Sequence, residues 1–141
     1  MGVTNLSGLL IDMDPQLEHN KYYFGVIDQS ALFVLAQYMQ YITGVFQEDE
    51  GITIIFVEAL KSIVEQRTKK PLVGPFAKIT LNVNSDLLAV GFLAKITKEL
   101  AKEEISVNAV SAYYHDHLFV EESKREKVMG ILTKISRDSK K

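Results

Sequence analysis

The stretch that decides the fold is NSDLLAVGFLAKITKELAKEEISV, which runs from Asn84 to Val107. A polar loop leads to a glycine, an amphipathic helix follows, and a β-branched segment ends the stretch. Apolar side chains recur at helical spacing, with lysines on the opposite face. We therefore predict half of a β-α-β unit, with a helix over residues 87–103 and an open backbone at Gly91 near its N-terminus.

The composition is that of an ordinary globular protein of one or two small domains. The 141 residues are 47% hydrophobic and 24% charged. The net charge is −2 and no basic cluster contains aromatic residues, so we expect no nucleic-acid partner. The absence of cysteine excludes disulfides and thiolate metal sites. No apolar run approaches the roughly 20 residues of a membrane helix and no secretory signal is present, so we expect no membrane partner and a cytoplasmic location.

The first half of the chain is predicted to contain four strands and two helices. Leu6–Met13 is a short apolar run closed by a turn sequence, which predicts a strand. Asp28 and Ser30 are N-cap candidates for the first helix, and Gly44 is expected to end it. The other predicted elements of this half are strand 22–27, helix 31–42, strands 45–48 and 52–57, and helix 58–66.

The second half repeats this order after a segment rich in charge, proline and glycine between Thr68 and Pro75. We therefore predict two domains, residues 1–70 and residues 71–141. Ser123 and Glu126 have the spacing of a capping box. A last helix follows them, with apolar residues at i, i+3, i+4 and i+7. The other predicted elements of this half are strand 76–83, helix 87–103, and a hairpin of 106–114 with 118–120.

Apart from the extra N-terminal strand over Leu6–Met13, which could complete the sheet of either half, both halves read strand, helix, strand, strand, helix. Phe56-Val57-Glu58 and Phe119-Val120-Glu121 occupy equivalent places at the ends of strands. This order predicts an α+β fold of two ferredoxin-like βαββα units, each an antiparallel sheet with its helices on one face. Each half is close to the size at which a lone core is marginal, so we expect the halves to dock.

Residues 90–97, VGFLAKIT, followed by residues 105–107, ISV, resemble the first helix of an ACT domain. In that signature a glycine opens the helix and apolar residues follow it. The usual aspartate and proline before the glycine are not matched, because Val90 replaces the proline and Asp86 lies further back. The second half is also similar to small bacterial proteins with two ACT domains and no assigned function. The likeness covers residues 76–135 by sequence and the first half by the order of its elements.

The resemblance implies a regulatory protein that binds a small molecule, commonly an amino acid, at the loop before the helix. The unpaired N–H groups and positive dipole charge of a helix N-terminus suit a carboxylate. By its match to the signature, Gly91 is a predicted ligand contact, together with its neighbours Phe92 and Leu93. The side chains of Phe92 and Leu93 also suit a buried core. Asn84 and Ser85 suit capping and turn roles as well as ligand contact. The remaining candidate ligand contacts are Asn108, His115 and Asp116.

The sequence His115-Asp116-His117 allows two interpretations. Residues two apart in a strand share a face, so both histidines are candidates to chelate a metal. A catalytic zinc site normally takes three protein ligands, however. The favoured interpretation is a turn at His115 and Asp116, since both residue types tolerate positive φ. We therefore predict no metal and no cofactor, and no nucleophile motif is present that would indicate an enzyme.

The leading hypothesis is a non-enzymatic ligand sensor made of two ACT-like domains. Its expected partners are a small molecule, most simply an amino acid, a second copy of the chain in a homodimer, and a regulated protein. An alternative is a structural or protein-interaction module without a ligand. A third and weaker alternative is a metal-dependent enzyme that uses the His115 and His117 hairpin.

Overall fold

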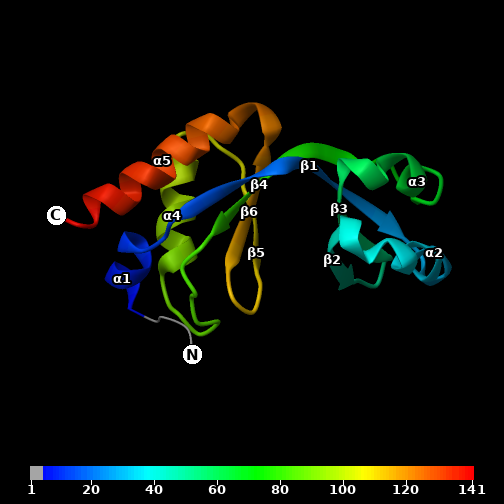
Figure 1. Cartoon of the computed structure of the whole chain (residues 1–141), viewed down its shortest axis with the longest axis horizontal. Coiled ribbons are helices and arrows are strands. Elements are labelled where there is room, and N and C mark those ends of the chain that lie inside the picture. Colours follow the sequence, from blue (N-terminus) through cyan, green and yellow to red (C-terminus); the bar gives the residue numbers. More distant parts are fainter. Residues whose placement is uncertain (1–4) are drawn as a thin grey trace. The chain divides into compact units, whose positions relative to one another are not determined.

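The computed structural model describes residues 5–141. Helices and strands are interspersed along the chain, as the colours of Figure 1 show. In chain order the elements are α1 (Leu6–Ile11), β1 (Pro15–Ile27), α2 (Gln29–Leu35), the 3₁₀ helix η1 (Ala36–Tyr41), β2 (Ile42–Gln47), β3 (Ile52–Val57), η2 (Glu58–Leu60), α3 (Lys61–Glu65), β4 (Val73–Leu81), α4 (Phe92–Lys102), β5 (Asn108–Ser111), β6 (Asp116–Glu121), η3 (Glu122–Lys124) and α5 (Arg125–Asp138).

The chain forms two compact units. The terminal unit contains the described residues up to His19 together with Ala77–Lys141, and the inserted unit is Asn20–Phe76. Strands β1 and β4 contribute to both units because the boundaries fall inside them. The domain division into residues 1–70 and 71–141 stays a prediction. By its contacts, α1 belongs with the second half of the chain.

The terminal unit is a sheet in the order β1-β4-β6-β5, packed against α1, α4 and α5. Strands β5 and β6 are antiparallel, with Asn108 opposite Phe119 and Ser111 opposite Asp116. Alternate residues of β4 and β6 face the helices, since side chains two apart in a strand share a face. The buried core that results contains Leu9, Leu10, Met13, Ala77, Ile79, Leu81, Val83, Phe92, Ile96, Leu100, Ile105, Leu118, Val120, Val128, Leu132 and Ile135.

The inserted unit is an antiparallel sheet in the order β2-β3-β1. Ile52, Ile54 and Phe56 of β3 alternate toward one face, where they pack with the residues of α2, η2 and α3. Leu35 of α2 and Val64 of α3 are completely buried there. The α+β class with antiparallel sheets and helices on one face, predicted from the order of elements, is confirmed.

The prediction of a strand over Leu6–Met13 is wrong, because this segment forms the helix α1. The Asn5 side chain caps the helix by accepting a hydrogen bond from the Gly8 N–H at 2.8 Å. Leu9 and Met13 lie one helical turn apart and are both completely buried. The apolar spacing at positions 6, 9, 10 and 13 is helical, and the short length of the run concealed it.

Two further local predictions are wrong. Gly44 does not end a helix: the predicted helix 31–42 becomes η1 after Leu35, and Gly44 lies in β2 beside an irregularity in its pairing with β3. Ser123 and Glu126 form no capping box, because the 3₁₀ helix η3 leads directly into α5 and the N-cap residue Lys124 makes no side-chain cap. A 3₁₀ turn satisfies the first backbone groups in place of the cap.

The remaining differences concern the ends of elements. The helix predicted over residues 87–103 begins only at Phe92, and the residues before it form a loop. The strand predicted over 106–114 is limited to β5, and Asp116, predicted in the turn, begins β6. The last helix is confirmed as α5, in which Val128, Leu132 and Ile135 are buried.

Candidate functional site

The N-terminus of α4 is open. Gly91 is the N-cap residue, its φ of 91° lies in the left-handed region, and it has no side chain to cap the first turn. A glycine accepts this conformation without strain, and the helix ladder starts from its carbonyl, which accepts from the Lys95 N–H at 3.0 Å. Among residues 5–141 no side chain caps the first turn, and the N–H groups and dipole of a helix N-terminus favour an anion.

The N-terminus of α2 in the inserted unit provides the contrast. There the carboxylate of Asp28 accepts a hydrogen bond from the Ala31 N–H at 2.8 Å. This backbone hydrogen bond, with a second from the Ser30 hydroxyl, lowers the pKa of the Asp28 carboxyl. An acidic side chain thus already occupies the anion position of α2, whereas the same position of α4 has no side-chain acid.

The loop before α4 is anchored by a buried polar pair. The Ser85 hydroxyl donates to the Asp116 carboxylate at 2.9 Å, and both residues are only 6% exposed. The bond ties the loop to the first residue of β6. It uses the polar groups of two residues that were predicted to contact a ligand, so it gives them a structural role, and their contact with a ligand stays a prediction.

The rest of the loop presents one acid and several apolar side chains. Asp86 is the only charged residue between Asn84 and Leu93. One oxygen of its carboxylate accepts from the Leu88 N–H at 2.8 Å, which shapes the loop. Leu88 and Val90 are 85% and 83% exposed. Asp86 was not among the predicted ligand contacts, because its spacing from Gly91 does not match the family signature.

The residues predicted beside Gly91 divide between backbone and core roles. Phe92 is buried in the core of the terminal unit, and Leu93 packs against that core. Their side chains hold α4 in place, and their backbone N–H groups lie in its first turn. Asn84 is exposed at the start of the loop. Asn108 lies at the opposite end of the β5–β6 ladder from the pair formed by Ser111 and Asp116, so the structure does not bring it to the loop.

The two histidines of the hairpin have different surroundings. His117 Nδ1 lies 3.0 Å from the Thr80 hydroxyl oxygen. His115 Nδ1 is buried and has no hydrogen-bond partner among the described residues. Between residues 5 and 141, no three side chains of histidine, aspartate or glutamate come together as a metal site would require. The metal-enzyme alternative therefore gains no supporting ligand cluster from the described residues.

The surroundings of His117 make the terminal unit sensitive to acid. Burial, followed by the positive charges of Lys78 and His115, lowers the pKa of His117, and the carboxylates of Asp116 and Glu18 oppose that shift only in part. The folded protein therefore takes up this proton less readily than the unfolded chain does. Stability consequently falls as the pH drops through about 6.5, the ordinary histidine pKa.

We expect the variant His117→Gln to lose less stability than the wild type between about pH 7.5 and pH 5.5. Glutamine keeps a polar group near Thr80 and does not titrate. Urea unfolding at both pH values measures the effect. The matched control is His19→Gln, because His19 is exposed. Equal pH dependence in the wild type and His117→Gln would contradict the expectation.

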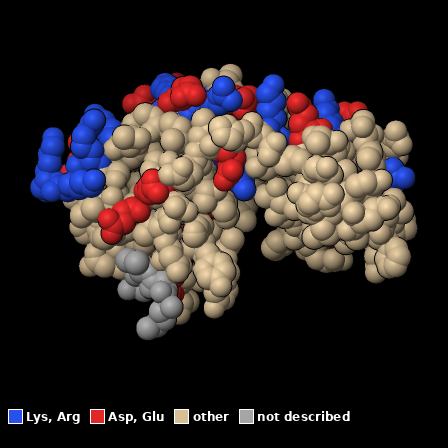
Figure 2. All heavy atoms as spheres, in the orientation of Figure 1, with Lys and Arg blue, Asp and Glu red and all other residues tan. Residues whose placement is uncertain are grey.

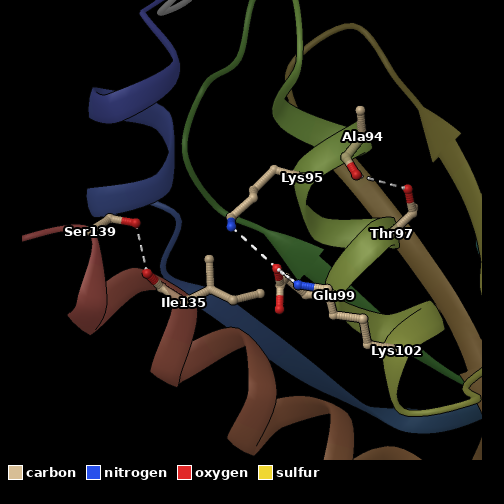
Figure 3. Close-up of polar contacts among 7 residues, drawn as sticks. All are labelled: Ala94, Lys95, Thr97, Glu99, Lys102, Ile135 and Ser139. Atoms are coloured by element: carbon tan, nitrogen blue, oxygen red, sulfur yellow. Dashed lines mark hydrogen bonds and ion pairs between the residues drawn. The ribbon is translucent and has the colours of Figure 1, made fainter.

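A groove lies between α4 and α5 on the surface of the terminal unit. It encloses about 330 Å³ and is lined by residues such as Lys95, Glu99 and Ile135. Figure 3 shows that Glu99 accepts from Lys95 at 3.2 Å and from Lys102 at 3.0 Å. These lysines lower the pKa of the Glu99 carboxyl. Because Glu99 is already paired with two lysines, this groove carries no proposal of a ligand site.

Together, these features define a ferredoxin-like α+β protein in which α4 begins at a glycine beside a short loop. Models of the ACT domain match residues 1–60 and residues 74–134. The chain belongs to the ACT domain family. The ACT domain is a regulatory, non-catalytic domain, so the prediction that the chain is not an enzyme follows from its family.

Several solved structures have a similar fold. A Vibrio cholerae protein of unknown function, described as a possible transport protein, is 31% identical, with a TM-score of 0.71 over 89% of this chain and 91% of its own. The regulatory subunit of aspartate kinase from Thermus thermophilus is 13% identical, with a TM-score of 0.62 over 86% of this chain and 95% of its own. The aspartate kinase of Clostridium acetobutylicum is 12% identical, with a TM-score of 0.70 over 88% of this chain and 34% of its own. No curated protein is similar enough to count as a match.

The last two likenesses show the fold alone. Family membership supports a regulatory role that depends on binding a ligand. None of the helices between residues 5 and 141 has the length and apolar character that crossing a membrane requires.

Proposed function

We propose that this protein is a regulatory sensor that binds a free amino acid at the N-terminus of α4. The observation that carries the proposal is the first turn at Gly91, which no described side chain caps and which follows a loop directly, whereas α2 is capped by its own acid and α5 is entered through a 3₁₀ turn. The ligand carboxylate would accept from the first-turn N–H groups. Asp86, the only charged residue of the loop, would attract the ligand ammonium group.

The loop also favours a class of amino acid. Leu88 and Val90 are almost fully exposed beside the open helix N-terminus, and covering them with an apolar ligand would remove that surface from water. We therefore propose an amino acid with an apolar side chain. A thermal-shift screen of the twenty amino acids, followed by calorimetry, tests this. Leucine, isoleucine and valine should raise the melting temperature, and aspartate and lysine should not.

Regulation would follow from a shift in population. A ligand that binds one arrangement of paired ACT domains better than another stabilises that arrangement. The proposed output is therefore a change in self-association or in binding to a regulated protein. If none of the twenty amino acids raises the melting temperature, the amino-acid sensor is contradicted, and the protein-interaction module without a ligand becomes the better hypothesis.

We expect Asp86→Asn to weaken binding of the responding amino acid about 2- to 5-fold, because an exposed ion pair to the ligand ammonium is lost. Asparagine keeps an oxygen that can accept from the Leu88 N–H, so the loop should keep its shape. Calorimetry with the same amino acid measures the change. Des-amino analogues, which carry only the carboxylate, should bind both proteins equally. A loss of affinity for the des-amino analogue as well would assign Asp86 a purely structural role.

The inserted unit supplies a specific observation for self-association. Phe33 of α2 and Phe46 of β2 are 86% and 71% exposed. Strand β2 is an edge strand of that unit and its sequence, ITGVFQ, contains no charge, although charges are the usual protection of an edge. Figure 2 shows few charged side chains on the visible face of this unit. We propose that this surface forms the homodimer.

We expect the wild-type chain to elute with twice its monomer mass in size-exclusion chromatography with light scattering, and Phe46→Lys to elute as a monomer. A lysine on an edge strand opposes strand pairing and places a charge in an apolar contact. Lys98→Ala on the exposed face of α4 is the control and should remain dimeric. A dimer that persists in Phe46→Lys would place the contact elsewhere.

A further inference from the structure

The segment Thr68–Pro71, read from the sequence as a boundary, lines a cavity in the inserted unit. The cavity measures about 540 Å³. Its charged lining consists of Lys61, Lys69 and Lys70 against the single acid Glu65. The chain as a whole has a net charge of −2, so this local excess of positive charge is not a general property of the surface. The proposed amino-acid site lies in the other unit and does not use these residues.

The lysine backbones are held in place. The Lys69 N–H donates to the Val26 carbonyl at 2.8 Å. The Thr68 hydroxyl oxygen lies 3.1 Å from the same carbonyl and 2.7 Å from the Lys70 carbonyl. These contacts tie the segment to strand β1. It therefore behaves as part of the fold and not as a free linker.

The third lysine is positioned by an aromatic ring on the cavity wall. Lys61 Nζ lies 4.9 Å from the centre of the Tyr23 ring and 3.8 Å from a Glu65 carboxylate oxygen. The Tyr23 hydroxyl donates to Glu58 at 2.9 Å. Burial and this hydrogen bond raise the pKa of Tyr23, so the hydroxyl stays neutral and adds no negative charge to the cavity.

We infer that this cavity binds a phosphate group, either as inorganic phosphate or as the phosphate of a small metabolite. Lys61 is paired with Glu65, so Lys69 and Lys70 provide the two positive charges that match a phosphate dianion, and Lys69 also acts on the nearby Asp28 carboxylate. Lysine binds phosphate as a compact point charge, and its several donors reach different oxygens. The wall formed by Tyr23 and Leu72 leaves room for a carbon skeleton beside the phosphate.

The test is a titration of the full chain with inorganic phosphate at constant ionic strength, followed by amide chemical shifts. Lys69, Lys70 and Gly74 should show saturable shifts that chloride does not produce. The variant K69Q/K70Q should weaken binding about tenfold, since two of the three lysines are lost. The control K98Q/K134Q removes the same charge from exposed positions of the terminal unit and should bind as the wild type does.

The possible outcomes distinguish a free phosphate ion from the phosphate of a metabolite, and specific binding from charge screening. Tighter binding of glycerol phosphate than of inorganic phosphate supports a metabolite ligand, and the reverse supports the free ion. Shifts that grow linearly without saturation, or equal weakening in both double variants, mean charge screening and overturn the inference. The variant Lys61→Gln removes the third lysine of the cavity and leaves the Thr68–Lys70 segment unchanged. The amino-acid screen remains independent, so failure of either proposal leaves the other standing.

Discussion

Replacing Leu9 by alanine is expected to lower the free energy of unfolding by about 2–5 kcal/mol, as for other fully buried leucines. Leu9 is 0% exposed and belongs to the core formed by α1, α4, α5 and the sheet of the terminal unit. The truncation leaves a cavity where well-packed neighbours can collapse only in part. The Ser136 hydroxyl, which donates to the Ile11 carbonyl at 2.8 Å, also attaches the end of α1 to α5 and limits relaxation.

Urea unfolding followed by circular dichroism measures this loss. Leu88→Ala is a matched control, because it removes the same atoms from a side chain that is 85% exposed, and its effect should stay within about 0.5 kcal/mol. Equal stabilities of the two variants would mean that α1 does not belong to the core. The comparison thus tests the largest difference between the predicted and the observed fold, the helix at Leu6–Ile11.

Replacing Gly91 by aspartate is expected to weaken amino-acid binding about tenfold or more relative to Gly91→Asn. Both side chains have nearly the same shape and both tolerate the positive φ of 91° at this position better than most residues do. Only aspartate adds a negative charge, which repels a ligand carboxylate by about 1–4 kcal/mol at contact distance. The variant reproduces at α4 the acid that Asp28 supplies at α2.

Calorimetry with the amino acid selected by the screen measures the difference between the two variants. Thermal unfolding without ligand should show similar stabilities for both, since backbone strain is common to them. If both variants bind with the same affinity, the ligand carboxylate does not lie at the N-terminus of α4. That result would contradict the proposed binding mode while leaving family membership intact.

Elements with a strong periodic pattern were predicted well from the sequence. The apolar residues of α4 and α5 recur with the helical period, and Ile96, Leu100 and Leu132 are completely buried. The β-branched run of β3 has the predicted limits, Ile52–Val57. In these segments the local pattern and the tertiary packing require the same structure, so local reasoning is sufficient.

The predictions failed where short segments depend on distant partners. The run at Leu6–Met13 is compatible with a strand or a helix, and its packing against α4 and α5 favours the helix. Gly44 has the residue type of a helix stop, but pairing with Ile55 of β3 places it in a strand. A single residue type carries too little information when backbone partners are far away in the sequence.

In the candidate site, too, the local pattern was predictable from the sequence and the contacts between distant segments were not. The sequence by itself determined that an amphipathic helix lies here with Gly91 near its N-terminus, because the apolar pattern of the helix is strong, and the structure set its start at Phe92. Only the tertiary structure decided that Ser85 and Asp116 bond to each other and that Asn108 lies away from the loop. These positions depend on strand register, and register follows from packing between segments that the sequence separates.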